Sequence, residues 1–219
     1  IRDPNYVDAR LNLADSLFRN GRIEEAAAHL RRAIEAEPEN EYAHQRLGVV
    51  LAEQRKIPEA TACFLAALEA NPRFAPAHFE LGVLLAGAGK LAEAKSHLAE
   101  AIRLDRTDLG AHLAIAAILS SEGRLHDAAD HYYRALEADP NLVMALLELA
   151  AIRATSDNPA FRDGAEALRL AERACQVTRN TDPAALVVLA QAQAELGHYD
   201  EAAEIAARAL QIVKAGGLE

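Results

Sequence analysis

Histidine is the residue type best placed to do chemistry in this sequence, because it recurs at a fixed interval. Successive members of two sets of residues are 34 residues apart, and we call each set a column. One column consists of His44, His78 and His112, and the other consists of His29, Cys63, His97 and His131. Imidazole and thiolate groups are zinc ligands, but such ligands must converge at about 2 Å from one ion. Stacked helix pairs lie about 10 Å apart. Each column therefore predicts packing or surface side chains rather than a metal site.

Other chemical motifs are incomplete. Asp127 and His131 stand four residues apart and could share a surface ion, yet no further ligand follows at a matching spacing. The segment Gly87 to Lys90 lacks the preceding strand and the remaining positions of a phosphate-binding loop. The sequence contains no nucleophile elbow and no His-Glu-x-x-His motif. We therefore predict no catalytic, cofactor-binding or metal-binding residue and expect that the protein is not an enzyme.

The composition excludes several classes of partner. The 219 residues carry a formal net charge of -10, which disfavours nucleic acid because phosphate contacts require basic side chains. No apolar run approaches the roughly 18 residues of a membrane span, so we expect no membrane insertion.

Cys63 and Cys175 are far apart in the sequence, which predicts two reduced thiols. Ala and Leu dominate the hydrophobic residues, which favours helices.

The elements that carry these residues repeat with the same period. In the first repeat, we expect a helix over about 7–20 that ends at Gly21 and a second helix over about 23–36. Pro38 prevents this second helix from continuing into the next repeat. Arg55 replaces this glycine in the second repeat. The repeats are 7–40, 41–74, 75–108, 109–142, 143–182 and 183–216. The fifth contains an inserted loop at 155–164, with its second helix resuming at Ala167.

Small residues recur at two positions of every repeat where paired helices must approach closely. One column is Ala26, Ala60, Ala94, Ala128, Ala167 and Ala202, and the other is Ala33, Ala67, Ala101, Ala135, Ala174 and Ala209. With Leu13-Ala14, Gly21 and Pro38 of the first repeat, this pattern resembles the tetratricopeptide repeat family. The last two repeats are similar to the closing segment of bacterial multi-repeat members. The resemblance implies an all-α, right-handed α-solenoid (superhelix) of six helix-turn-helix repeats.

The resemblance also implies domain organisation and a binding surface. We expect one domain over 1–219, with 1–6 the tail of a truncated upstream repeat, since Asp3-Pro4-Asn5 matches the end of a repeat. In the family, ligands bind along the concave face formed by the first helix of each repeat. The matching positions are Phe18, Tyr42, Gln45, Arg46, Val49, Phe79, Glu80, Val83, Leu113, Ala117, Met144, Leu147, Val187 and Gln191, with Leu11 in the same register.

Most of these positions are apolar, which suits an amphipathic helix or an extended apolar peptide. Alternatively, some of the side chains pack against neighbouring helices. In some family members a carboxylate clamp, built from several cationic side chains, binds the C-terminus of a peptide. Of these cations only Arg46 is retained here. The matching positions are Leu11, Asp15, Arg46, Pro76 and Glu80. The asparagine ladder of the O-linked N-acetylglucosamine transferase repeats keeps only Asn12. Both recognition modes are therefore excluded.

The function predicted from the sequence is that of a non-enzymatic protein-interaction scaffold for a peptide or helix of a partner. A substrate-presenting arm of a larger bacterial, glycosyltransferase-like enzyme is one alternative. A self-assembling module is another alternative, in which the terminal repeats form a homo-oligomer. It is suggested by Ile205 and Ile212, which lie on a face of the last helix that no later repeat covers. A bacterial source is favoured by the excess of Arg over Lys. The compartment, cytoplasm or periplasm, is not encoded in this segment.

Overall fold

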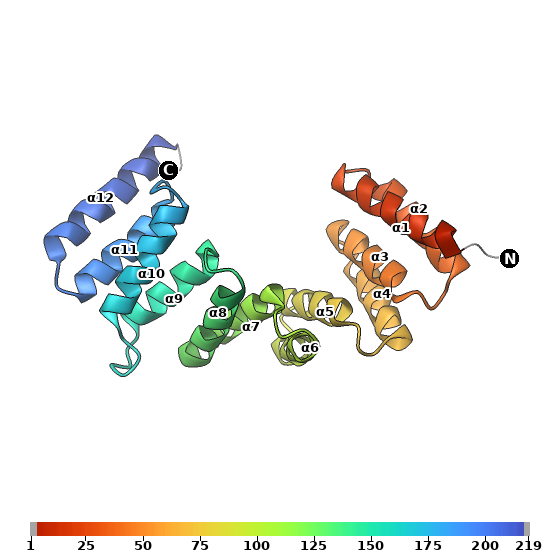
Figure 1. The fold of residues 1–219 in the computed structure, drawn as a ribbon, viewed down its shortest axis with the longest axis horizontal. Coiled ribbons are helices and arrows are strands. Elements are labelled where there is room, and N and C mark those ends of the chain that lie inside the picture. The colour runs from red at the N-terminus through yellow and green to blue at the C-terminus, as the bar shows by residue number, and fades with distance from the viewer. Residues whose placement is uncertain (1–3, 217–219) are drawn as a thin grey trace. The chain divides into compact units, whose positions relative to one another are not determined.

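The computed structural model describes residues 4–216, which form α-helices joined by turns and contain no strand (Figure 1). The helices are α1 (Pro4–Arg19), α2 (Ile23–Ala36), α3 (Glu41–Glu53), α4 (Ile57–Ala70), α5 (Ala75–Gly87), α6 (Leu91–Leu104), α7 (Leu109–Ser121), α8 (Leu125–Ala138), α9 (Val143–Thr155), α10 (Gly164–Val177), α11 (Pro183–Glu195) and α12 (Tyr199–Ala215). The predicted all-α solenoid of six helix pairs is confirmed. Odd-numbered helices are the first of each pair and are called A helices, and even-numbered ones are called B helices.

The first pair shows how closely the pattern sets the helix ends. Helix α2 has the predicted bounds, whereas α1 begins at Pro4, three residues before the predicted start. Pro suits the first turn of a helix, where its missing N–H has no partner to lose. The remaining residues of the predicted upstream tail, 1–3, lie outside the described part of the chain.

The turn inside each of the first four repeats places one residue in the left-handed conformation. Gly21 has a φ of 74°, and Gly89 and Gly123 have nearly the same value. In the second repeat Arg55 occupies this position with a φ of 59°. The turn therefore closes without glycine, as expected, at the cost of crowding between the Arg55 Cβ and its own backbone.

The two alanine columns lie on the B helices, and Ala67 of the second column packs against Phe74 and Ala77 at the start of the next repeat. Every member of both columns is buried. A third small position lies on the A helices: a Cβ added to Gly48 would stand 2.5 Å from the Phe64 ring, and one added to Gly82 would stand 2.6 Å from Leu98 Cγ. Small side chains are thus required because large apolar side chains of the B helix fill the same space.

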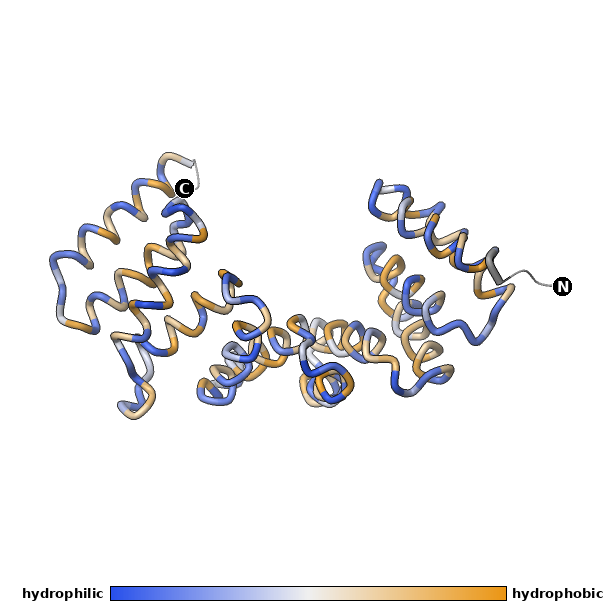
Figure 2. Tube along the Cα trace, in the orientation of Figure 1, coloured by the Kyte–Doolittle hydropathy of each residue, from blue (hydrophilic) through white to orange (hydrophobic). Residues whose placement is uncertain are grey.

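The helices form two units, α1–α6 and α7–α12, which we call unit 1 and unit 2. Within each unit every helix contacts the next one along the chain. In unit 1 the A helices α1, α3 and α5 also contact one another in sequence, and in unit 2 α9 contacts α11. Hydrophobic and hydrophilic residues alternate along the helices, as expected for amphipathic elements with one buried stripe (Figure 2). The single-domain assignment stays a prediction.

The fifth repeat contains the predicted insertion, with a helix-free segment at 156–163. Helix α10 begins at Gly164, three residues before the predicted restart at Ala167, because Asp163 caps it by accepting a hydrogen bond from the Glu166 N–H at 2.9 Å. Arg153 fastens the segment: it donates to the Phe161 carbonyl at 3.0 Å and pairs with Glu166 at 3.0 Å. The insertion is therefore an anchored loop.

None of the helices described between residues 4 and 216 combines the length and apolar character needed to cross a bilayer.

Candidate functional site

The A helices of unit 1 bring several predicted binding residues around one hollow. Five of them line it: Phe18 on α1, Gln45, Arg46 and Val49 on α3, and Glu80 on α5. The remaining lining residues are Ala14, Asp15, Leu30 and Val50, and the volume is about 200 Å³. We call this the first hollow. Three consecutive repeats contribute to it because their A helices contact one another.

A second hollow adjoins the first through a shared residue. Glu80 lines both, and Val83 is the other predicted binding residue in the second. Its remaining lining is largely apolar and consists of Ala52, Arg55, Ile57, Phe64, Leu84, Gly87 and Ala88, around about 450 Å³. Val83 and Ile57 are 41% and 40% exposed, so apolar surface here faces solvent. The two hollows together are called the unit 1 groove.

The charges of the first hollow are largely compensated within the protein. Arg46 Nη1 lies 3.0 Å from Asp15 Oδ2, and each side chain is about seven-tenths buried. The contact is an ion pair without hydrogen-bond alignment, and Arg46 Nη1 has no hydrogen-bond acceptor. Because two carboxylates, Asp15 and Glu80, accompany one guanidinium, the groove is unsuited to a free carboxylate, in agreement with the exclusion of the clamp.

The other predicted binding residues lie outside these hollows. Tyr42 is half exposed, and its ring meets Phe74 edge-on at 4.9 Å between ring centroids. Phe79 is partly buried. Leu11, expected in the same register, is 5% exposed, so its assignment to the ligand-facing surface was wrong. Leu11 is instead part of the core.

In unit 2 the predicted binding residues all reach the surface. Met144 and Val187 are 59% and 45% exposed, Ala117 and Gln191 are exposed, and Leu113 and Leu147 are partly buried. Two hollows of unit 2 are built from other residues. One is lined by Gly123, Arg124, Leu125, His126, Asp127, Ser156, Asp157, Asn158 and Phe161, and the other by His112, Asp130, His131, Tyr133, Arg134 and Glu137.

The two histidine columns come together in pairs, which the sequence analysis missed. Nδ1 of His78 on α5 lies 3.0 Å from Nδ1 of His97 on α6, and His112 and His131 repeat this distance on α7 and α8. Burial lowers the pKa of His97 and of His131, and the neighbouring imidazole lowers each further. The constant offset of 19 residues between the two columns could have predicted these pairs, because it places one histidine on each helix of the same repeat.

The remaining titratable groups give little support to catalysis. Asp127 accepts a hydrogen bond from Arg124 Nε at 2.7 Å and is paired with that guanidinium. Burial raises the pKa of the Cys63 and Cys175 thiols, which keeps them protonated and weakly nucleophilic. Among residues 4–216, no three His, Cys, Asp or Glu side chains form a group able to hold a metal ion.

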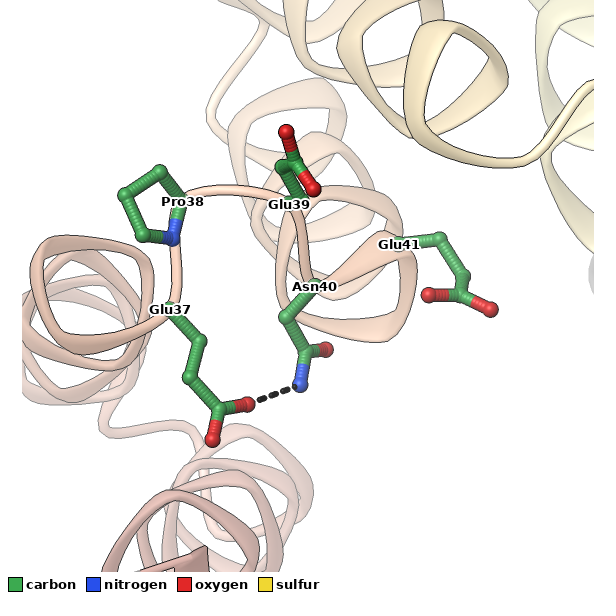
Figure 3. A pocket seen from close by; sticks show the side chains of 5 residues that line it. All are labelled: Glu37, Pro38, Glu39, Asn40 and Glu41. Atoms are coloured by element: carbon green, nitrogen blue, oxygen red, sulfur yellow. Dashed lines mark hydrogen bonds between the residues drawn. The ribbon is translucent and has the colours of Figure 1, made fainter. Parts of the chain in front are cut away.

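A further hollow of about 520 Å³ lies at the turn between α2 and α3 and is shown in Figure 3. It is lined by five consecutive residues, 37–41. Asn40 donates to Glu37 Oε2 at 2.9 Å and accepts from the Ala43 N–H, so its side chain caps α3. This is the local concavity of an acidic turn and brings together no distant elements.

Sequence profiles described as tetratricopeptide repeat match residues 2–47 and 17–81, residues 85–143 and residues 183–208, together more than half of the chain. No curated protein matches the chain in sequence. Among solved structures, PilF of Pseudomonas aeruginosa superposes with a TM-score of 0.83 at 20% identity, covering 98% of this chain and 94% of that one.

Two further solved structures are similar. PilW, described as a type IV pilus biogenesis factor, gives a TM-score of 0.76 at 20% identity over 97% of this chain and 94% of its own. YrrB, described as a TPR protein with an unusual peptide-binding site, gives 0.62 at 24% identity over 81% and 88%. At these identities the similarity concerns the fold.

Proposed function

The chain belongs to the tetratricopeptide repeat family, and from this premise we propose that it is a non-enzymatic scaffold that binds a peptide or helix of a partner protein along the unit 1 groove. The observation that carries the proposal is the gathering of Phe18, Gln45, Arg46, Val49, Glu80 and Val83 around two adjoining hollows. A binding surface assembled from three helices can contact several successive residues of one ligand.

The groove suits an apolar segment. Val83, Leu84 and Ile57 offer partly exposed aliphatic surface in the second hollow, and burying such surface contributes about 25 cal/mol per Å². In the first hollow, Arg46 Nη1 is buried against Asp15, so that ion pair forms part of the wall of the hollow. The ligand would thus gain its contacts mainly from apolar side chains.

Charge favours a basic residue beside the apolar ones. Asp15 and Glu80 outnumber Arg46 in the first hollow, and the whole chain carries a net charge of -10. A lysine or arginine in the ligand would reduce the repulsion between the two carboxylates. An acidic segment would meet repulsion and would leave Asp15 to compete for Arg46.

The test is a selection of random linear peptides displayed on phage, followed by affinity measurements on the enriched sequences by fluorescence anisotropy. Val83→Glu places a charge in the second hollow. Leu65→Glu is the matched control, because Leu65 is 45% exposed on α4 and lines neither hollow. We expect Val83→Glu to weaken binding at least about tenfold, equivalent to about 1.4 kcal/mol, while Leu65→Glu retains it. Equal losses in both variants would refute the proposed groove.

Self-assembly is a second candidate, favoured by the exposed apolar surface of α12. Tyr199 and Leu210 are 71% and 53% exposed, and Ile205 and Ile212 are partly exposed. A second copy of the chain would bury these side chains in a symmetric contact. Sedimentation equilibrium over a dilution series would reveal such a dimer, and Leu210→Glu should abolish it. A monomer at all concentrations would rule this candidate out.

A further inference from the structure

Two repeats carry a pair of imidazoles that face each other across the helix hairpin. In both pairs the two Nδ1 atoms are 3.0 Å apart. One ring comes from the fourth position of the A helix, and the other comes from the B helix 19 residues later. The arrangement is local to each hairpin: His78 and His97 belong to unit 1, and His112 and His131 belong to unit 2.

The hydrogen bonding of His78 fixes which of its nitrogens carries the lone pair. Its Nε2 lies 3.1 Å from the carbonyl oxygen of Pro72, which can only accept, so Nε2 carries the hydrogen. The neutral ring therefore presents an unprotonated Nδ1 to His97. A backbone carbonyl that orients the far nitrogen in this way is the usual outer support of a metal-binding histidine.

The spacing of the Nδ1 atoms is that of two ligands on one ion. Imidazole nitrogens bind divalent transition metals at about 2.0–2.1 Å, so two of them at a right angle stand about 2.9 Å apart, and at a tetrahedral angle about 3.3 Å apart. We propose that the His78/His97 and His112/His131 pairs each chelate one divalent transition-metal ion through their Nδ1 atoms. The right-angled geometry favours Cu²⁺, whose four strong ligands lie in a square plane, with Ni²⁺ next.

Access and protonation agree with this assignment. The hollow of about 430 Å³ beside His112 and His131 is also lined by Asp130 and Glu137 and leaves room for water to complete the coordination. Because burial and the partner ring lower the pKa of His97 and of His131, both rings are neutral near pH 7, as ligands must be. On binding, the hydrogen that joins the two Nδ1 atoms moves to the outer nitrogen of His97 or to solvent.

A metal ion in either pair would link an A helix to its B helix. An ion that binds the folded chain stabilises it in proportion to the logarithm of its concentration. Each ion would therefore act within one hairpin and independently of the peptide groove, since none of the four histidines lines either hollow of that groove.

The chain contains its own control. The first repeat has Arg10 and His29 at the same two positions, with Arg10 Nη1 3.5 Å from His29 Nδ1. A guanidinium is not a metal ligand, so this hairpin offers a single imidazole. Cys63 occupies the same column in the second repeat, and a thiol can reduce Cu²⁺, so the experiment uses a Cys63→Ser background without an affinity tag.

The experiment titrates this chain with Cu²⁺ and follows binding by calorimetry and by electron paramagnetic resonance. We expect two equivalents per chain with hyperfine coupling to two nitrogens. His97→Ala and His131→Ala should each lose one equivalent, the double variant should lose both, and His29→Ala should keep two. Cu²⁺ should raise the Tm of the parent chain and leave that of the double variant unchanged.

Two results would overturn the proposal. One is a double variant that retains both equivalents, and the other is a loss in His29→Ala equal to that in His97→Ala, which would indicate scattered single histidines. Circular dichroism confirms that each variant is folded. His78→Gln and His112→Gln repeat the test from the A helices, so that a misfolded B-helix variant does not leave the question open.

Discussion

The buried helix interfaces and the unit 1 groove share some side chains, such as Phe64, but differ in composition. The interfaces combine small residues with large apolar side chains such as Phe64, and the two alanine columns are buried in all six repeats. The groove mixes Phe18, Gln45, Arg46 and Glu80, and among its predicted binding residues only Val49 and Val83 repeat one residue type at the same position of successive repeats. Helix packing thus requires small side chains at fixed positions, whereas the exposed positions of the groove are not restricted in this way.

The largest effect should come from the core side of this comparison. Leu81 on α5 is 2% exposed, and Leu81→Ala would leave a cavity that the rigid hairpin cannot fill. We expect a loss of about 2–5 kcal/mol in unfolding free energy, measured by urea denaturation. A loss no larger than that of an exposed substitution such as Leu65→Ala would contradict the buried position.

Gly82→Ala should give the next largest effect. Its added Cβ would stand 2.6 Å from Leu98 Cγ and 3.2 Å from the Ala94 carbonyl oxygen. Overpacking of this kind costs about 1–3 kcal/mol. Gly87→Ala in the same helix is the control, because no atom lies within 4 Å of the added Cβ. It should be neutral or stabilising by up to about 1 kcal/mol, since alanine is the better helix former.

Arg55→Gly should stabilise the protein. A non-glycine residue at a φ of 59° destabilises the folded state by about 1–2 kcal/mol, which the substitution would relieve. Glycine also has greater freedom in the unfolded chain, which offsets about 0.5–1 kcal/mol of this stabilisation. The net increase in unfolding free energy should be about 0.5–1 kcal/mol. The reverse change, Gly21→Ala at a φ of 74°, should destabilise. If both substitutions lowered the Tm, the assigned turn geometry would be incorrect.

The smallest effect should be the pH dependence of the histidine pairs, because His97 and His131 are only partly buried. Their pKa values are lowered in the folded state, so the unfolded chain binds more protons as the pH falls below about 6.5. Stability should be complete above this pH and should decline toward pH 5. In the His97→Gln, His131→Gln double variant, denaturation midpoints should depend less on pH, and an unchanged dependence would assign the effect to other groups.

The sequence predicted the fold in detail because packing dictates residue size. The alanine columns and the period located every helix pair, and the bounds of α2 were right. The start of α1 at Pro4 was missed, because Asp3-Pro4-Asn5 was interpreted as the end of an upstream repeat, whereas Pro4 occupies the first turn of the helix. Leu11 was assigned to the binding surface but is buried, because position in the repeat alone does not determine which neighbouring side chains cover a residue.

The candidate site was predictable only in part. Six of the residues predicted from their position in the repeat line the unit 1 groove, because equivalent positions of successive A helices lie near one another where those helices are in contact. Position in the repeat also predicted Tyr42 and Phe79 as binding residues, although neither side chain lines a hollow of the groove. The contact between the histidine columns was missed because it needs the distance between two helices rather than the spacing along one.

The most direct test measures peptide affinity and unfolding free energy on two adjacent substitutions, Gly82→Ala and Val83→Glu, using a peptide enriched in the phage selection. If different residues of α5 serve packing and binding, Gly82→Ala lowers stability while its folded fraction binds with unchanged Kd. Val83→Glu, at a position 41% exposed, weakens binding at unchanged stability. If either substitution alters both properties together, the separation of interface and groove is contradicted.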